Sequence, residues 1–115
     1  MNRAQRDSTS GEPVSLLLEY SHMFFTYVLL CGDGNHYIGY TSNIEERFAR
    51  HTNGYVFSTK GRLPVKLIFY EAFLHQQDAT RREQYFKTTA GKRALRLMMR
   101  EYFTSRPVPD YEDRM

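Results

Sequence analysis

The stretch that decides the fold runs from Phe24 to Thr41 and reads FFTYVLLC, GDGN, HYIGYT. Its first eight residues are almost all apolar or aromatic, and its last six regain that character after four turn-forming residues. Two such runs joined by a turn that contains Asp-Gly are the strongest short-range signal for a β-hairpin. We therefore predict two neighbouring antiparallel strands, one on each side of the turn at residues 32–35.

The residues after the hairpin predict helices and one further strand. Asn43 and Glu46 have the spacing of a capping box, which marks the start of a helix. The expected elements are, in order, a helix, a loop, a strand and two helices: Ile44–Thr52, residues 54–62, Val65–Ala72, Asp78–Thr88 and Lys92–Phe103. We expect Gly91 to end the first of the last two helices. The order ββαβαα predicts an α+β fold, a three-stranded antiparallel β-sheet flanked by helices.

The 115 residues have room for one domain, and 41% of them are hydrophobic, which is enough for a core. Polar composition predicts a flexible N-terminal arm at 1–22 and a disordered acidic tail at 106–115, on either side of a folded unit at 23–105. The single cysteine excludes an internal disulfide framework. Without a signal peptide pattern or an apolar run long enough for a membrane span, we expect a cytoplasmic protein with no membrane partner.

Charge is unevenly distributed along the chain. The net charge is +3, but residues 23–106 hold thirteen Lys and Arg against seven acidic residues. A basic domain attracts polyanions and binds them in a salt-dependent way, which favours DNA as a partner and leaves RNA open as well. Arg93, Arg96 and Arg100 recur on one side of the last predicted helix and are candidates for binding the phosphate backbone; a merely solvated face is the alternative.

Five side chains could carry chemistry. Tyr27 and Tyr37 lie on the two arms of the hairpin, where amphipathic sheet residues are the ordinary interpretation. Arg47 and His51 are four residues apart and share one face of a helix, so they could bind a phosphate together, or simply be solvated. Glu83 is a candidate acid, and its alternative role is a surface pair with a lysine one turn later.

Several of these residues recur together in a known pattern. The pattern comprises Tyr27 to Cys31, the turn, Tyr37-Ile-Gly-Tyr-Thr41, Ile44, Arg47, His51, Tyr70-Glu71, Ala79, Arg82-Glu83 and Lys87. In this order and spacing the sequence resembles the GIY-YIG endonuclease superfamily, most closely its small stand-alone bacterial (UPF0213-like) members. The resemblance runs from about residue 25 to 87. The first tripeptide, Phe-Thr-Tyr, departs from the family pattern because it lacks the glycine and the isoleucine.

The resemblance implies a catalytic site and a metal. By position in the family pattern, the catalytic residues are Tyr27, Tyr37, Arg47, His51 and Glu83, and Glu83 is the metal ligand. Lys60 lies where stand-alone members often carry a basic residue. Because no asparagine follows Asn53, Lys60 or Arg82 is the candidate for the distal side of the phosphate. The family uses one divalent cation, so we expect Mg²⁺ or Mn²⁺ and no small-molecule cofactor.

The expected function is hydrolysis of phosphodiester bonds in DNA by a metal-dependent endonuclease, in DNA repair or in the processing of structured DNA. Glu83 would anchor the cation, and Arg47 would neutralise developing charge. Tyr27 could act as the general base, since we expect a cationic pocket to favour its phenolate, and Tyr37 and His51 would then orient water or relay the proton. A noncatalytic nucleic-acid-binding module on the same fold is the alternative, and a protein-interaction domain is a third hypothesis.

Overall fold

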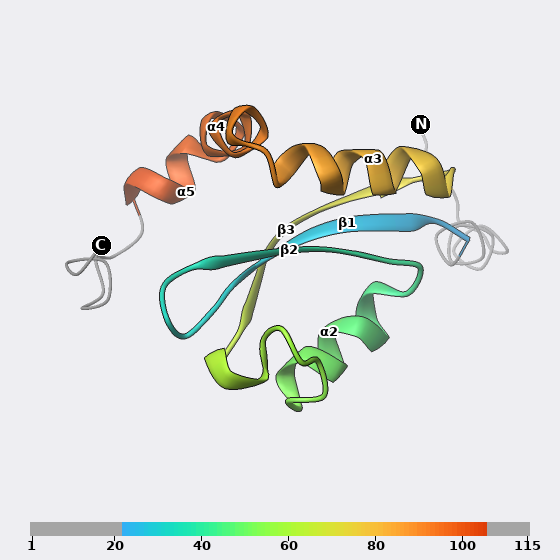
Figure 1. Ribbon diagram of the computed structural model, residues 1–115. Coiled ribbons are helices and arrows are strands. Elements are labelled where there is room, and N and C mark those ends of the chain that lie inside the picture. Colours follow the sequence, from blue (N-terminus) through green and yellow to red (C-terminus); the bar gives the residue numbers. More distant parts are fainter. Residues whose placement is uncertain (1–21, 106–115) are drawn as a thin grey trace, which may run out of the picture.

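A three-stranded antiparallel sheet organises the computed structural model, which describes residues 22–105 (Figure 1). The strands are β1 (Phe24–Leu30), β2 (His36–Thr41) and β3 (Lys66–Phe73), in the order β2-β1-β3. The predicted hairpin and the predicted α+β fold class are both confirmed. The predicted arm and tail lie outside the described residues, apart from residue 22.

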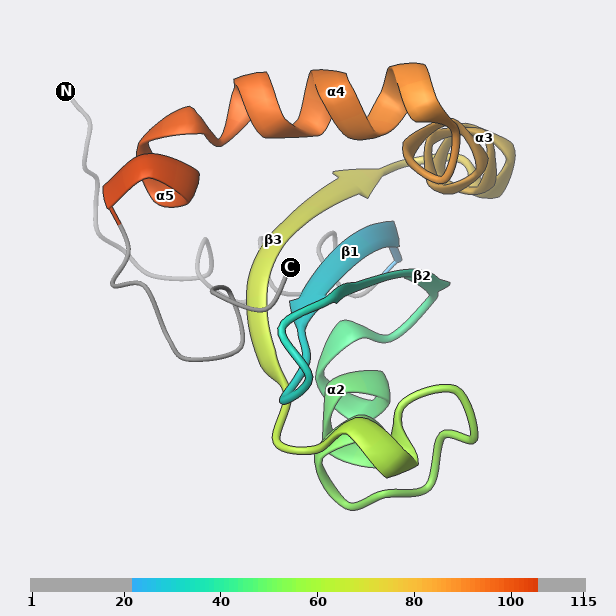
Figure 2. The ribbon, with the colours of Figure 1, turned by 60° about the vertical axis from the view of Figure 1, so that its left-hand side comes forward.

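Helices cover both faces of this sheet (Figures 1 and 2). One face carries α2 (Ile44–Thr52), and a short 3₁₀ helix, η1 (Lys60–Arg62), follows it in the chain. The opposite face carries α3 (Gln76–Phe86) and α4 (Thr89–Met98), and the chain continues into α5 (Arg100–Ser105). No described helix is both long and apolar enough to cross a membrane.

The central strand divides the core into two clusters because its side chains alternate between the two faces. Phe25, Tyr27 and Leu29 pack with Ile44 on the side of α2. On the other side, Val28 packs with Phe86 of α3 and Leu95 of α4. This second cluster holds those two helices on the sheet. The hydroxyl of Thr26 donates to the backbone carbonyl of Ala79 (2.6 Å), which fixes α3 across β1.

The C-terminal helices differ from the prediction in two ways. Gly91 does not end a helix but lies inside α4, because its backbone approaches the last turn of α3 so closely that a β-carbon would lie 1.8 Å from the carbonyl oxygen of Tyr85. Thr88 instead caps α4 by accepting from the backbone N–H of Gly91 (3.0 Å). The single helix expected over Lys92–Phe103 is two helices, since the backbone at Met99 leaves helical geometry.

The bounds of two other elements shift slightly. β3 runs one residue later than expected, and α3 begins two residues before Asp78 and ends at Phe86 rather than Thr88. Segment 54–62, predicted as a loop, contains the 3₁₀ helix η1 at its end. Changes of this size are ordinary at the ends of elements, where side-chain capping and tertiary contacts override local pattern.

Candidate active site

The phenol of Tyr27 lies directly over Gly39 of the neighbouring strand. Tyr27 is paired with Gly39 in the sheet, and its side chain is almost completely buried. A β-carbon on Gly39 would lie 2.5 Å from both the Cζ and the Oη of Tyr27. The glycine of the Tyr-Ile-Gly motif therefore makes room for the hydroxyl end of this tyrosine.

Replacing Gly39 with Ala should displace the Tyr27 hydroxyl and lower the rate of the expected phosphodiester cleavage about a hundredfold, because a shift of roughly 1 Å in a reacting group costs that much. Overpacking should also cost about 1–3 kcal/mol of the free energy of unfolding. Rates and thermal melts of Gly39→Ala would be compared with Gly61→Ala, whose added β-carbon meets nothing within 4 Å. Equal rates for the two variants would show that the position of the phenol is unimportant.

Tyr37 lies on the same face of the sheet as Tyr27. The sequence alone did not fix this relation, but the strand register places Tyr37 opposite Leu29, which is two residues from Tyr27 on β1. The rings of the two tyrosines lie with their centroids 6.2 Å apart. Both rings also contact the His51 ring, at 5.6 Å from Tyr27 and 5.1 Å from Tyr37.

Helix α2 supplies two polar partners for the phenols. Asn43 caps the helix by accepting from the backbone N–H of Glu46, as the sequence predicts. One turn further on, the Nε of Arg47 donates to the Tyr27 hydroxyl oxygen (3.3 Å), and one turn after that the Nε2 of His51 lies 2.8 Å from the same oxygen. The i, i+4 spacing thus brings Arg47 and His51 to one phenol.

Thr59 is a site residue that sequence reasoning missed. It is fully buried, and its hydroxyl lies 2.8 Å from the Nδ1 of His51, which is fully buried as well. Since Arg47 already donates to the Tyr27 oxygen, we assign the phenol proton to the bond with His51 Nε2. His51 then carries its own proton on Nδ1 and donates it to Thr59, so the histidine is held in one tautomer.

Burial sets the protonation states of this cluster. It raises the pKa of Tyr27 to about 12, and the opposing hydrogen bond from Arg47 does not overcome it. The expectation of a favoured phenolate was therefore wrong for the metal-free protein, because loss of hydration penalises the phenolate more than one guanidinium stabilises it. The bond to Tyr27 raises the pKa of Arg47, with a smaller contribution from Tyr37, so the guanidinium stays charged.

The lowered pKa of His51 implies that the folded protein loses stability in acid. Burial, with the Arg47 charge as a second cause, lowers the pKa of His51 from 6.5 to about 4. Because the folded pKa is depressed, this contribution to stability is complete above pH 6.5 and is lost as the pH falls through about 4. Urea denaturation over that range should show about 2–3 kcal/mol more loss in wild type than in His51→Gln. Parallel pH profiles would mean that His51 is not buried in neutral form.

Glu83 approaches the cluster from the other side of the sheet, on α3. Its side chain is only 17% exposed, and its negative charge helps to raise the pKa of Tyr27. Its carboxylate also pairs with Lys87, 3.0 Å away, so the surface pair that the sequence offered as an alternative does form. The carboxylate is nevertheless mostly covered, and its charge reaches Tyr27 through the sheet.

The single carboxylate of Glu83 fits a divalent cation that keeps most of its bound water. Among residues 22–105 no group of three or more His, Cys, Asp or Glu side chains could enclose a metal. A single carboxylate is what Mg²⁺ or Mn²⁺ requires when water and substrate phosphate supply the other oxygens. Glu83 would hold such a cation.

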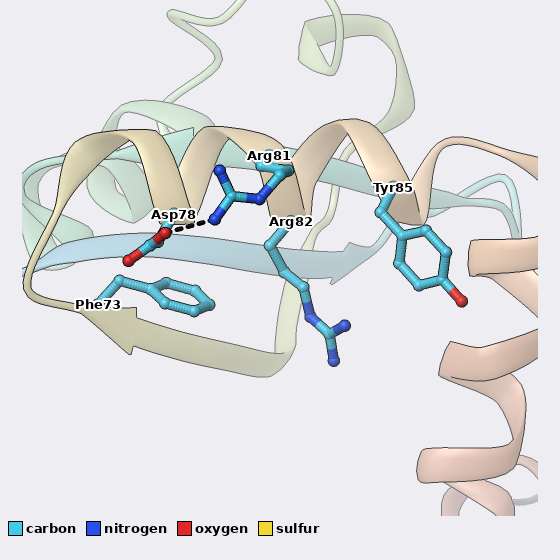
Figure 3. A pocket seen from close by; sticks show the side chains of 5 residues that line it. All are labelled: Phe73, Asp78, Arg81, Arg82 and Tyr85. Atoms are coloured by element: carbon cyan, nitrogen blue, oxygen red, sulfur yellow. Dashed lines mark hydrogen bonds and ion pairs between the residues drawn. The ribbon is translucent and has the colours of Figure 1, made fainter.

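The four predicted substrate-binding residues lie outside the tyrosine cluster. Arg82 makes two hydrogen bonds to the Glu71 carboxylate (2.8 and 3.2 Å) and stacks on the Phe86 ring. Lys60 and Arg96 also lie over aromatic rings, and Arg93 is exposed on α4. A hollow of about 520 Å³ lies beside Arg82, and none of the catalytic candidates lines it. Figure 3 shows the side chains that line this hollow, with Arg81 paired to Asp78.

Comparison with known proteins gives a consistent result. The GIY-YIG catalytic domain matches residues 23–96. A UPF0213 protein of Pediococcus acidilactici is 42% identical over 79 residues, which are 65% of this chain and 80% of that protein. A UPF0213 protein of Bacillus licheniformis is 47% identical over 73 residues, 63% of this chain and 73% of that protein. The solution NMR structure of a UPF0213 protein from Bacillus halodurans is 28% identical, covers 81% of this chain and 94% of that one, and has a TM-score of 0.45. The chain belongs to the GIY-YIG catalytic domain family.

Proposed function

We propose that this protein is a metal-dependent endonuclease that hydrolyses phosphodiester bonds in DNA. GIY-YIG domains are generally nuclease domains, and nucleic acid is the substrate that this membership suggests. The observation that supports catalysis is the hydrogen-bonded series from Arg47 through Tyr27 and His51 to Thr59. The mostly covered carboxylate of Glu83 adds a charge that acts on Tyr27. Mutually bonded acid–base groups with shifted pKa values are typical of active sites.

Each residue has a part in the proposed reaction. Arg47 neutralises charge on the phosphate oxygens as the transition state forms. Tyr27 acts in its phenolate form, after its own proton has passed to solvent, and accepts the proton of the attacking water. His51 Nε2, 2.8 Å from the same oxygen, positions the tyrosine side chain. Thr59 holds the histidine ring from its other side. A divalent cation bound by Glu83 would supply positive charge that stabilises the phosphate and favours the phenolate.

A noncatalytic nucleic-acid-binding module is the second candidate function. It accounts for the basic central region and for the exposed arginines of α4. It does not account for the mostly covered carboxylate of Glu83, whose charge acts on Tyr27, because a negative charge there weakens the binding of a phosphate. The observed placement of Glu83 therefore favours catalysis.

The test is incubation of the purified chain with labelled duplex, flap, branched and single-stranded DNA and with RNA, with and without Mn²⁺. We expect cleavage of at least one DNA substrate that needs the cation. Retention of DNA in a low-salt gel shift without any cleavage would instead support the binding module.

A further inference from the structure

The segment between α2 and η1 exposes two aromatic rings. In Figure 2 it forms a wide loop beside α2. Phe57 is 84% exposed and Tyr55 is 69% exposed, whereas Val56 and Thr59 of the same segment are buried. The buried pair anchors a turn in which the backbone N–H groups of Thr59 and Lys60 both donate to the carbonyl of Val56. The rings are thus held outward by an anchored backbone.

The surroundings of these rings are cationic. The ammonium of Lys60 lies 5.1 Å from the centre of the Phe57 ring. Residues 53–62 contain two basic side chains and no acidic one. Arg62 is engaged by Asp33 at 2.8 Å, which leaves Lys60 as the cation beside the exposed ring. An aromatic face beside a cation suits a ligand that carries both a flat base and a phosphate.

The segment is also joined directly to the proposed active site. Thr59 lies two residues after Phe57 and holds His51, which in turn contacts the Tyr27 hydroxyl. Two residues of extended chain span at most about 7 Å, so the α-carbon of Phe57 stays close to the anchor. A base that stacks on this ring would therefore belong to a nucleotide near the one whose phosphate reaches Tyr27.

We propose that Phe57 and Tyr55 stack on unpaired nucleobases beside the scissile phosphate, so that the substrate is nucleic acid with single-stranded nucleotides at the cut. The inference rests on the proposed nuclease function and names its substrate class. Stacking on a side chain requires a base with a free face, and within a duplex the neighbouring pairs cover both faces. Lys60 contributes by attracting the phosphate of the stacked nucleotide.

The test measures binding without cleavage. Wild type and Phe57→Leu are titrated, in EDTA, into an oligothymidylate longer than the roughly 16 nucleotides that a small single-strand-binding fold contacts, and into a duplex of mixed sequence. Phe57→Leu keeps an apolar side chain but removes the aromatic face. We expect it to bind the single strand about tenfold more weakly, equivalent to about 1.4 kcal/mol, and the duplex within twofold of wild type.

Two variants serve as controls. Phe57→Tyr keeps the aromatic face and should restore single-strand affinity. Tyr85→Leu removes a partly exposed ring from α3, outside the segment, and should change nothing. A 2-aminopurine base in the strand gives a direct readout, because stacking on Phe57 should quench its fluorescence in wild type and not in Phe57→Leu.

The outcomes separate this inference from the nuclease proposal. Tighter single-strand binding that Phe57→Leu loses supports stacking even if Mn²⁺ produces no cleavage. Cleavage with equal single-strand affinity in wild type and Phe57→Leu overturns the stacking inference and leaves the nuclease standing. Equal affinity of wild type for single strand and duplex overturns it too, because the exposed rings would then not select unpaired bases.

Discussion

Glu83→Gln should cleave DNA about a thousandfold more slowly than wild type or worse, with an almost unchanged thermal melt. The amide keeps the shape of the side chain but removes the charge that would hold a cation, and such a cation contributes several kcal/mol to the transition state. Loss of the ion pair with Lys87 should cost only a few tenths of a kcal/mol, since Lys87 is half exposed. The measurement is cleavage rate against Mn²⁺ concentration, beside a melt in the absence of metal.

Lys87→Gln is the matched control for this substitution. It breaks the same 3.0 Å ion pair but leaves the carboxylate in place. If Glu83 acts as a metal ligand, Lys87→Gln should stay within about twofold of the wild-type rate. Equal losses in the two variants would assign the effect to the pair, and a fully active Glu83→Gln would remove the acid from the site.

Tyr27→Phe should lower the cleavage rate by about a hundredfold to ten-thousandfold, the range that general bases contribute. Removing the hydroxyl also leaves the Nε2 of His51 and the Nε of Arg47 without their bond to it, which should cost about 1–3 kcal/mol of stability. Because the pKa of Tyr27 is about 12 in the metal-free protein, the wild-type rate should rise with pH through the neutral range. The variant should lose that dependence.

The other tyrosines of the hairpin test whether this effect belongs to one phenol. Tyr37→Phe removes a hydroxyl from the same cluster and should slow cleavage less, with the pH dependence retained. Tyr40→Phe is the control, because Tyr40 pairs with Thr26 and stacks on Phe24, on the face of the sheet away from α2. A flat pH profile in Tyr37→Phe, with a normal one in Tyr27→Phe, would exchange the two roles.

Local signals account for the parts of the fold that the sequence predicted well. The Asp-Gly turn fixes the hairpin, and the Asn43 side chain caps α2 as its spacing to Glu46 indicates. Because an i, i+4 helix face is short-range geometry, the pattern also placed Arg47 and His51 together. The prediction of site residues was therefore strongest where few residues separate the partners.

Long-range packing explains what the sequence did not predict. Thr59 lies in a segment without any period, and its bond to His51 depends on a turn anchored by buried Val56. Gly91 looked like the end of a helix, although its role is to let α4 approach Tyr85. The pKa of Tyr27 follows from burial, which composition does not report. Each of these depends on which surfaces meet, rather than on neighbouring residue types.

The long sequence separation of the Thr26–Ala79 hydrogen bond leads us to expect that the two parts of the proposed site form at different stages of folding. The phenols, Arg47, His51 and Thr59 all come from one continuous stretch of chain, and contacts of short sequence separation form fastest. Glu83 arrives only when α3 docks on the far side of β1, where Thr26 holds it across 53 residues of sequence. A fluctuation that lifts α3 would withdraw the carboxylate while the phenol network stays closed, so the proposed catalysis would depend on the least local of these contacts.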